Sequence, residues 1–529
     1  MAVKNHYERI MLPFSALVVL NGHGDLYGLL VAQGFGIQRG IGEVFVALVL
    51  LPKKQAAPKQ AKEKSRDFHG RVRIKYWGAF LTSFYLLIKI KFFLSKKAFS
   101  PAFFLFFRFQ QPFMKLIALQ HPSRRLQARL PLPTSKSESN RLLIIEALAK
   151  AQGEQPAITW EALAAARDTQ TMQRLLQSPE EILNVLDAGT TMRFLTAYCA
   201  VTQRAAVLTG TARMCERPIH ILVEALRHIG ADIEYLGKEG FPPLRIKSFT
   251  QRQSVVRLRG DVSSQYISAL LMAAPLLPQG LTLEIEGVLA SRPYVQMSLE
   301  LMAYMGVQHR WEENCISIAP QRYQLKPYRV EADWSGASYW FSAMALAEEG
   351  TLYLEGLKEQ SLQGDKAILQ LGDALGVAAR FDAGGLHLSK KEAQTRLSWD
   401  FSDCPDLAQS VVACCAAKGI LLEAKGLESL RIKETDRIAA LQKELAKIGA
   451  RFEESASEKG LFVLHPAQGI GQQPRFASYD DHRMAMAFAP LALCGSILIE
   501  EPAVVAKSYP SFWDDCRRAG FVIEESSPD

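Results

Sequence analysis

The 529-residue sequence lacks the features by which membrane-spanning and metal-dependent proteins are usually recognised. Its longest apolar run, residues 77–88, is much shorter than the roughly 20 residues that a spanning helix needs. The histidines form no H-E-x-x-H pattern, and there is neither a C-x-x-C pair nor a G-x-x-x-x-G-K-[ST] loop. These absences argue against a membrane anchor, a metal site and a nucleoside-triphosphate site, so neither a metal nor a cofactor is expected.

Cysteine is absent before residue 114 and irregularly spaced after it. All eight cysteines lie in the later part of the chain, without the regular spacing of a disulfide framework. Scattered thiols of this kind are typical of core residues in a reducing compartment. We therefore expect a cytoplasmic protein.

Acidic residues are also scarce in the leading segment, residues 1–113. This segment holds 17 Lys and Arg against 5 Asp and Glu, a formal charge of +12. Because the whole chain carries +8, the remainder carries −4. The segment also holds 15 of the 27 phenylalanines. We interpret it as an N-terminal extension of unknown role, and our hypothesis is that Met114 is the true start. The alternative is nucleic-acid or membrane binding through its basic residues, although neither partner is expected.

A glycine recurs at a fixed point of a repeated pattern in the rest of the chain. Each glycine follows an apolar helical stretch and precedes an alternating, strand-like one, at intervals of 70 to 76 residues. Such a glycine fits the left-handed position that ends a helix. The series comprises Gly230, Gly306, Gly376, Gly449 and Gly520.

A second, interleaved pattern starts with polar residues, continues as a small and apolar helix, and ends before a strand. Copies begin at Ser135, Gly189, Ser263, Asp333, Asp406 and Asp481, the first two being less complete. Six repeats are therefore predicted, each with one buried helix. Six helix N-termini aimed at one cleft would attract anions through their free N–H groups, whereas ordinary helix caps are the simpler alternative.

Cations accompany these polar starts and favour the anion site over simple caps. They are Lys136, Arg141, Arg193, Arg213, Lys433, Arg437, Arg483 and Lys507. Arginine and lysine in such numbers suit small, multiply charged anions. Glu434 and Asp406 lie among them, and carboxylates kept ionised by cations suit general acid–base chemistry. Simple ion pairing along the helix is the alternative for Glu434.

Several short strings occur in a fixed order along residues 125–520. They include Thr134-Ser135-Lys136-Ser137, Ala188-Gly189-Thr190, Ser263-Ser264-Gln265, Lys433-Glu434-Thr435-Asp436-Arg437 and Asp481-His482-Arg483. Together they resemble the enolpyruvyl transferase family, most closely its branch that uses shikimate 3-phosphate. The resemblance implies an α/β fold, a two-domain inside-out α/β barrel with six βαβαββ repeats, three per domain. One domain would comprise residues 114–133 and 333–529 and the other 134–332, in a chain expected to be monomeric.

The resemblance also implies the chemistry. The enolpyruvyl group of phosphoenolpyruvate would pass to the 5-hydroxyl of shikimate 3-phosphate by addition and elimination, with Asp406, Glu434 and Lys136 as the catalytic residues. The implied phosphoenolpyruvate-binding residues are Lys136, Gly189, Arg213, Gln265, Arg437, Arg483 and Lys507. The implied shikimate-3-phosphate-binding residues are Ser137, Arg141, Ser263, Ser264, Ser291, Tyr294, Asp406, Ser429 and Lys433.

A sister branch of the family transfers enolpyruvyl to UDP-N-acetylglucosamine and is the alternative within the family. That branch carries a reactive cysteine in a Gly-rich mobile loop. Cys215 is the only candidate here, and the string Met214-Cys215-Glu216 around it is not Gly-rich. We therefore interpret Cys215 as incidental.

Overall fold

The computed structural model describes residues 47–50, 88–91, 103–107, 116–154, 160–261 and 263–526. The chain divides into two compact units, Met1–Phe113 and Met114–Asp529. In the first unit, strands β1 (Ala47–Leu50), β2 (Ile88–Lys91) and β3 (Phe103–Phe107) form an antiparallel sheet in the order β1-β3-β2. Both hypotheses about the leading segment concern mainly residues outside the described ones, so they stay hypotheses.

The second unit contains two separate hydrophobic clusters. One is built from residues between 142 and 330, which we call the central lobe. The other is built from residues between 117 and 132 and between 332 and 521, which we call the terminal lobe. That the two lobes are separate domains stays a prediction.

Two four-stranded sheets belong to the central lobe. In each, the first two strands are parallel and the last two form an antiparallel hairpin. The strand orders are β6 (Ile182–Asn184), β7 (Ala206–Thr209), β9 (Leu244–Phe249), β8 (Ala231–Tyr235), and β10 (Val255–Arg259), β11 (Leu281–Glu286), β13 (Cys315–Ile318), β12 (Arg310–Glu312). With the helices between the strands, this is the predicted βαβαββ repeat.

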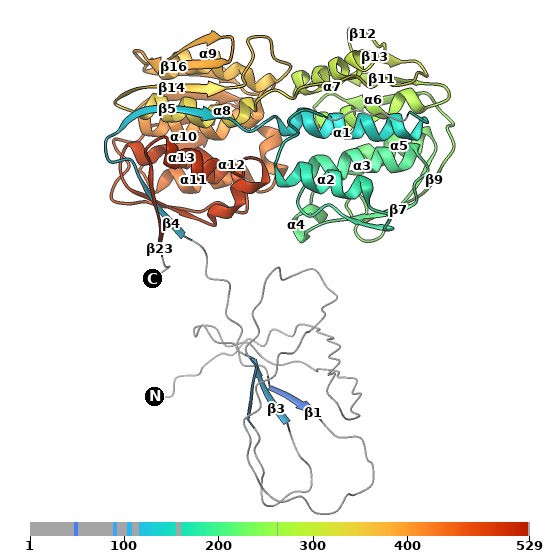
Figure 1. The fold of residues 1–529 in the computed structure, drawn as a ribbon, viewed down its shortest axis with the longest axis horizontal. Helices are drawn as coiled ribbons and strands as arrows, with labels where there is room; N and C mark the ends of the chain where they lie inside the picture. The colour runs from blue at the N-terminus through green and yellow to red at the C-terminus, as the bar shows by residue number, and fades with distance from the viewer. Residues whose placement is uncertain are drawn as a thin grey trace, which may run out of the picture. The chain divides into compact units, whose positions relative to one another are not determined.

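Three further four-stranded sheets belong to the terminal lobe, and two of them borrow a strand from the start of this unit. Strand β4 (Leu116–Gln120) pairs with β22 (Ile497–Glu500) and β23 (Val522–Ser526), and β5 (Arg125–Pro131) pairs with β14 (Glu349–Glu355). In Figure 1 the blue and cyan β4 and β5 accordingly run among yellow to red elements. The remaining strands are β15 (Val377–Asp382), β16 (Gly385–Lys390), β17 (Arg396–Asp400), β18 (Leu421–Lys425), β19 (Arg451–Glu454), β20 (Phe462–His465) and β21 (Arg475–Phe476).

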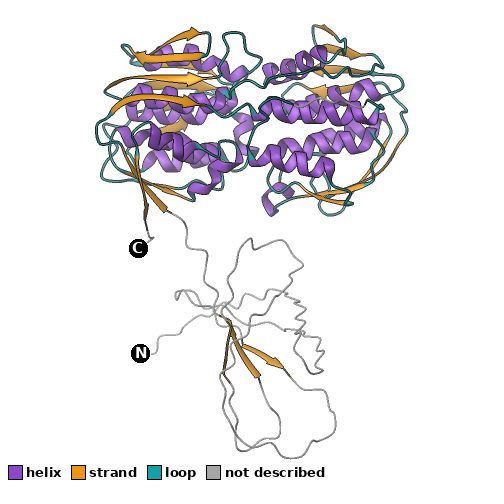
Figure 2. Cartoon of the chain, in the orientation of Figure 1, coloured by secondary structure: helices purple, strands orange, loops and turns teal. Residues whose placement is uncertain are grey.

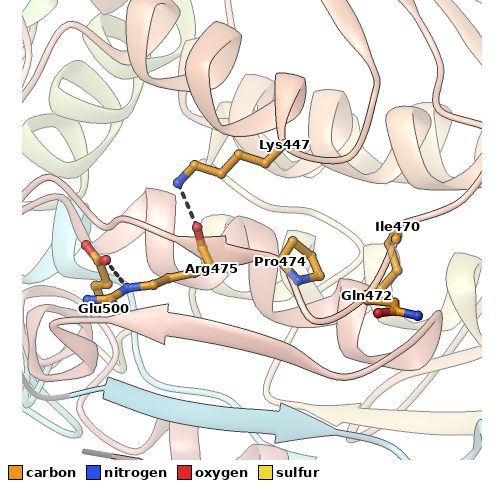
Figure 3. Close-up of a pocket in the computed structure, with 7 residues that line it drawn as sticks. Lys447, Ile470, Gln472, Pro474, Arg475 and Glu500 are labelled. Carbon is orange, nitrogen blue, oxygen red and sulfur yellow. Dashed lines mark hydrogen bonds and ion pairs between the residues drawn. The ribbon is translucent and has the colours of Figure 1, made fainter. Parts of the chain in front are cut away.

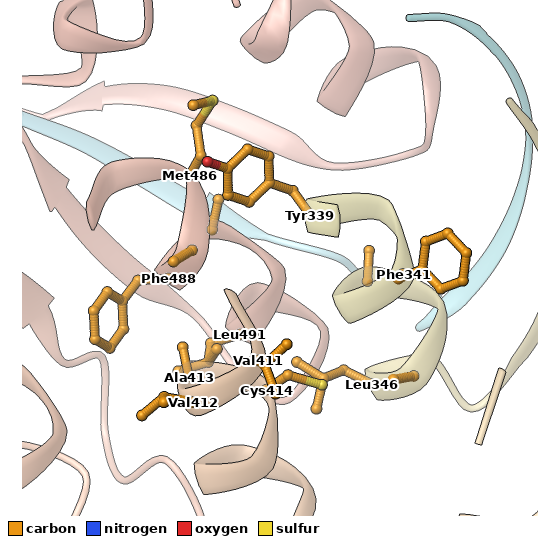
Figure 4. Packing of buried hydrophobic residues seen from close by; sticks show 14 of the residues in the cluster. Tyr339, Phe341, Leu346, Val411, Val412, Ala413, Cys414, Met486, Phe488 and Leu491 are labelled. Carbon is orange, nitrogen blue, oxygen red and sulfur yellow. The ribbon is translucent and has the colours of Figure 1, made fainter. Parts of the chain in front are cut away.

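Six buried helices fill the interior of the lobes, with strands at the periphery (Figure 2). They are α1 (Lys136–Ala151), α3 (Gly189–Val201), α6 (Ser264–Ala273), α8 (Trp334–Leu346), α10 (Ala408–Lys418) and α12 (His482–Phe488). Figure 4 shows how α8, α10 and α12 pack through side chains such as Tyr339, Val411 and Met486. The six helices predicted from the polar starts are confirmed.

The recurring glycines also occupy the predicted position. Each follows the end of an outer helix with a positive φ, between 78° at Gly449 and 120° at Gly230, where a side chain would be strained. These outer helices are α5 (His220–Ile229), α7 (Arg292–Tyr304), α9 (Ile368–Leu375), α11 (Arg437–Ala446) and α13 (Phe512–Arg518).

The first repeat departs from the other five. It has helices α1 and α2 (Arg167–Gln177), but among the described residues of the second unit only five four-stranded sheets are formed, not six. The physical reason is visible in the sequence, because no helix-glycine-strand segment occurs before Gly189. The inside-out α/β arrangement therefore holds with one sheet fewer than six full repeats require.

Two chain crossings join the lobes side by side. Thr134 and Ala332 form an antiparallel bridge, and Asp333 N–H donates to the Pro133 carbonyl at 2.8 Å. The starts of α1 and α8 are consequently adjacent, and Lys136 N–H donates to Asp333 Oδ2 at 3.3 Å. The crossings thus bring helix starts of both lobes to the same place.

Candidate active site

Side-chain caps fix four of the six buried helix starts. Ser135, Ser263, Asp333 and Asp481 each accept a hydrogen bond from a backbone N–H of the first turn of their helix. The capped turns carry Lys136, Ser264 and Arg483, which are predicted site residues. Capping therefore accounts for the polar residues, and the neighbouring cations and hydroxyls remain available for other contacts.

Arg437 is the centre of an ion-pair network in the terminal lobe. Its guanidinium donates to Asp481 Oδ2 at 2.7 Å, to Glu434 Oε2 at 2.9 Å and to Asp406 Oδ1 at 3.1 Å. Its side chain is 2% exposed. A buried guanidinium with three carboxylate partners fixes the position of both predicted acid–base carboxylates.

Asp406 has a second arginine partner. Arg483 donates to Asp406 Oδ2 at 2.7 Å and to the Asp406 carbonyl at 3.2 Å. Burial acts to raise the pKa of Asp406, but Arg483, Lys433 and Arg437 outweigh it and hold this pKa well below its usual range. Asp406 is therefore ionised at neutral pH.

Glu434 meets cations from both lobes. Lys507 Nζ lies 3.1 Å and Arg217 Nη1 3.7 Å from Glu434 Oε1, in addition to the bond from Arg437. Burial favours the neutral carboxyl, yet these three cations lower the pKa of Glu434 well below its usual value. Glu434 is accordingly an anion surrounded by positive charge.

Arg213 reaches from the central lobe to the loop that carries Glu434. Its Nε donates to the Glu434 carbonyl at 3.0 Å and its Nη2 to the Lys433 carbonyl at 3.1 Å. Lys507, from the terminal lobe, donates in the opposite direction to the Asp187 carbonyl at 2.9 Å. Arg213 and Lys507, two of the cations predicted to bind phosphoenolpyruvate, thus lie where the lobes meet.

Lys136 and His482 lie beside these cations. Lys136 Nζ donates to Asp168 Oδ2 at 3.0 Å. Neither ring nitrogen of the buried His482 has a hydrogen-bond partner among the described residues. Burial, followed by the charges of Lys136, Arg483 and Lys507, lowers the pKa of His482 well below its ordinary value, so the imidazole is neutral.

Apart from Ser429, the predicted hydroxyl ligands lie on the central lobe or on the first turn of α1, and Gln265 lies among them. Ser263 and Ser264 begin α6, and Gln265 Nε2 donates to Thr190 Oγ1 at 3.1 Å. Ser291 precedes α7 with φ of 54°, and its hydroxyl donates to the Ser402 carbonyl at 3.4 Å. Ser137 is half-buried in the first turn of α1. Gly189 begins α3 so close to Arg217 that a Cβ would lie 2.8 Å from Nη1.

Arg141 is turned into the polar interior. It donates to Ser298 Oγ at 2.7 Å, to the Ser137 carbonyl at 2.9 Å and to the Tyr294 carbonyl at 3.0 Å. Its side chain is buried, so in this state it ties α1 to α7. Its predicted contact with shikimate 3-phosphate stays a prediction, as does that of Ser429, which lies half-buried in η4 (Glu428–Ile432).

Several residues at the site were not among those predicted. Asp168 pairs with Lys136, Arg217 with Glu434, and Asp365 accepts a hydrogen bond from the Tyr294 hydroxyl at 3.0 Å. Asp481 and His482 belong to the string Asp481-His482-Arg483, so the sequence carried a signal that they lie near the site. Asp168 and Asp365 carry no local signal, because their partners lie 32 and 71 residues away.

A surface hollow of about 380 Å³ lies away from this network, between residues 447 and 500 of the terminal lobe (Figure 3). Its two cations are already engaged, because Lys447 donates to the Arg475 carbonyl and Arg475 pairs with Glu500. Within the described part of the chain, no group of three or more His, Cys, Asp or Glu could hold a metal ion. No helix in the same residues is long and apolar enough to cross a membrane.

Comparison with known proteins gives consistent matches. A protein-family profile described as "EPSP synthase (3-phosphoshikimate 1-carboxyvinyltransferase)" matches residues 158–516. A Bacteroides fragilis protein described as 3-phosphoshikimate 1-carboxyvinyltransferase is 45% identical over 411 residues, which are 77% of this chain and 98% of the relative. A Cellvibrio japonicus protein of the same description is 37% identical over 424 residues, 74% of this chain and 97% of the relative.

Solved structures resemble the fold as well. A structure of EPSP synthase from Acinetobacter baumannii superposes with a TM-score of 0.61 at 20% sequence identity. The match covers 78% of this chain and all of that one. At 20% sequence identity, this similarity supports the fold alone.

Proposed function

Because the chain belongs to the EPSP synthase (3-phosphoshikimate 1-carboxyvinyltransferase) family, we propose that its interlobe cations and the hydroxyls of the central lobe form the active site. The activity of this family is transfer of the enolpyruvyl group of phosphoenolpyruvate to shikimate 3-phosphate, with release of phosphate. The observation that carries the site assignment is the meeting of Arg213, Arg217 and Lys507 around ionised Glu434.

Phosphoenolpyruvate would bind among the cations. Its phosphate and carboxylate each need two or more donors, and arginine forks and lysine ammonium groups provide them. The proposed ligands are Lys136, Gly189, Arg213, Gln265, Arg437, Arg483 and Lys507. Several of these cations are held by protein carboxylates, so binding requires an exchange of partners.

Shikimate 3-phosphate would bind on the central lobe side, opposite Asp406. Hydroxyls at the start of α6 suit a phosphate, because they donate without adding charge and the helix N-terminus adds backbone N–H groups. The proposed ligands are Ser137, Arg141, Ser263, Ser264, Ser291, Tyr294, Asp406, Ser429 and Lys433. The adjacent positions of the two sites would place the acceptor hydroxyl against the enolpyruvyl carbon.

The proposed reaction is addition followed by elimination. A proton adds to the methylene carbon of phosphoenolpyruvate while the 5-hydroxyl, losing its proton to a base, attacks the neighbouring carbon. The tetrahedral adduct then loses a proton from the methyl group and phosphate by C–O cleavage. Asp406, Glu434 and Lys136 are the proposed proton-transfer groups, and the surrounding cations stabilise the charge that develops on the departing phosphate.

We also propose that the two lobes are domains that close on the substrates, in a monomeric, cytoplasmic protein. The crossings at Thr134 and Asp333 are the only backbone links that the proposed domain boundaries allow, which suits a hinge. All eight cysteines are free thiols, which supports a reducing compartment. Sedimentation of the purified chain tests the monomer, and a mass near 59 kDa is expected.

Phosphate release distinguishes the two branches of the family. We expect release only when phosphoenolpyruvate and shikimate 3-phosphate are both present. Phosphate release with UDP-N-acetylglucosamine in place of shikimate 3-phosphate would instead assign the chain to the sister activity. A protein lacking residues 1–113 serves as a second sample, since the proposed site contains none of these residues.

A further inference from the structure

Asp187 forms a charged contact between the lobes that no proposed substrate contact explains. It lies in the loop between β6 and α3, two residues before Gly189. Lys507, at the end of η6 (Pro502–Lys507) in the terminal lobe, donates to its carbonyl at 2.9 Å and to its carboxylate Oδ2 at 3.1 Å. Asp187 therefore holds a lysine that we assign to phosphoenolpyruvate.

The ammonium group of Lys507 is surrounded by protein oxygens. An ammonium group has three hydrogens to donate. Two are donated to the Asp187 carbonyl and to Asp187 Oδ2, and Glu434 Oε1 forms an ion pair with the same ammonium group at 3.1 Å. Since its side chain is only 1% exposed, Lys507 can bind an anion only by releasing one of these acceptors.

Asp187 is the partner that can be released at the lowest cost. Arg167, the first residue of α2 in the same lobe, donates Nη2 to Asp187 Oδ1 at 3.1 Å and to Oδ2 at 2.9 Å. If Lys507 leaves, the carboxylate therefore keeps a cation. Glu434 would also keep cations, Arg437 on Oε2 at 2.9 Å and Arg217 on Oε1 at 3.7 Å. Arg437, however, is itself assigned to phosphoenolpyruvate, whereas Arg167 is not.

The charge state of Asp187 agrees with its release from Lys507 when the substrate binds. Burial opposes ionisation of Asp187, but Lys507 and Arg167 together lower its pKa below the usual value. Asp187 is thus a full negative charge beside a lysine that a doubly charged substrate must also use. Like charges at such separations repel strongly in a partly buried site.

We propose that the contact of Asp187 with Lys507 is a latch that limits the affinity for phosphoenolpyruvate: the incoming substrate displaces Asp187 from Lys507, and the carboxylate then keeps only Arg167. The inference rests on the proposed function, in which Lys507 binds phosphoenolpyruvate. While Asp187 holds Lys507 it joins the lobes, and once phosphoenolpyruvate occupies Lys507 its charge opposes that of the substrate. Asp187 consequently weakens phosphoenolpyruvate binding and does not take part in proton transfer.

The direct test is Asp187→Asn, which removes the charge and keeps the carbonyl that Lys507 also uses. We expect the KM for phosphoenolpyruvate to fall about 2- to 5-fold, the size of one partly exposed ion pair. The KM for shikimate 3-phosphate and kcat should change less than twofold. Asp232→Asn, an equal change of charge at an exposed position of β8, is the matched control and should leave all three constants unchanged.

A second variant should act in the opposite direction. Arg167→Met removes the resting partner of Asp187, so Lys507 is held more tightly and the KM for phosphoenolpyruvate should rise about threefold. Part of this rise could come from loss of a cation near the site. The double variant separates the effects, because the rise should disappear when Asp187 is already Asn.

Three results would overturn the latch: an unchanged or higher KM for phosphoenolpyruvate in Asp187→Asn, an equal fall in Asp232→Asn, or an Arg167→Met effect that persists in the double variant. A merely structural role predicts a lower Tm with the KM unchanged. Calorimetric titration with phosphoenolpyruvate compares the same variants without turnover. It therefore decides the matter even if the wild type fails to release phosphate, an outcome that would count against the proposed function alone.

Discussion

The two lobes contribute different chemistry to the site. In the terminal lobe, Asp406, Arg437, Asp481 and Arg483 are bonded to one another at 2.7 to 3.1 Å. The central lobe offers Ser263, Ser264 and other hydroxyls at helix starts, together with Arg213, whose side chain is 43% exposed. One lobe is a fixed network of charge, and the other is a set of adjustable donors.

The difference indicates how a site for two anions can be assembled without collapsing in their absence. Buried cations need partners because an isolated charge in a protein interior is costly. The carboxylates of the terminal lobe fill that need and hold the cations in place, which reduces the reorganisation needed when charge develops. Hydroxyls need no such partner and can adapt to a phosphate when it arrives.

The largest expected effect falls on Glu434, where the two lobes meet. Glu434→Gln should cut kcat by about 10²- to 10⁴-fold, as is typical when a general acid–base group is lost. Steady-state phosphate release measures this loss, with Glu423→Gln, on strand β18, as the control. Near-normal turnover would mean that Glu434 is only the ion-pair partner of Arg437.

The next effect tests the fixed network. Arg437→Met leaves Asp406, Glu434 and Asp481 without their shared cation, and breaking a buried pair costs about 3–5 kcal/mol. We expect the free energy of unfolding to fall by that amount in urea titrations. The matched change in the other lobe, Arg213→Met, should cost less than about 1 kcal/mol because its pairs are partly exposed. Equal losses would remove the contrast between the lobes.

A smaller effect tests the adjustable donors. Ser264→Ala removes one hydroxyl from the start of α6 and should raise the KM for shikimate 3-phosphate about tenfold, the value of one hydrogen bond. The Tm and the KM for phosphoenolpyruvate should stay as they are. If both KM values rise together, the hydroxyls do not distinguish the two anions.

The smallest effect is a pH dependence at Asp365, in η2 (Gly364–Ala367) of the terminal lobe. Its carboxylate accepts hydrogen bonds from Tyr294 and Ser335. Burial, and then the charge of Asp406, raises the pKa of Asp365 to about 6. Because the pKa is raised, the carboxyl gains a proton as pH falls through 6, and it can no longer accept both bonds.

We therefore expect kcat/KM at pH 5.5 to be about fourfold below its plateau, the fraction set by a pKa near 6. Asp365→Asn should abolish this decline, since it cannot ionise, at a lower plateau. An acidic limb that persists in the variant would assign the titration to another group.

The sequence predicted the elements that depend on local rules. Gly230 and Gly449 end helices because only glycine is unstrained there, and Ser263 and Asp481 cap helices because their side chains reach the first N–H groups. The family and its α/β fold were predicted from short strings and are confirmed. The first repeat, which has no helix-glycine-strand segment before Gly189, forms no four-stranded sheet of its own among the described residues.

The pairing of charges could not be predicted in the same way. Arg213 contacts carbonyls 220 and 221 residues along the chain, and nothing in its own neighbourhood encodes that partner. Arg141 carries the same charge and lies in a similar string, yet packing turns it into the protein interior. The ion pair given as the alternative for Glu434 does exist, with Arg437 at 2.9 Å. The kinetics of Glu434→Gln therefore distinguish proton transfer by Glu434 from simple ion pairing.

The most direct test of the account is a crystal structure with shikimate 3-phosphate and an unreactive phosphoenolpyruvate analogue both bound. We expect the phosphate of shikimate 3-phosphate within hydrogen-bonding distance of Ser263 and Ser264, and the analogue contacting Arg213, Arg483 and Lys507. The contacts of Arg437 with Asp406 and Asp481 should be unchanged. Ligands bound away from the place where the two lobes meet, or loss of the contacts of Arg437 with Asp406 and Asp481, would contradict the account.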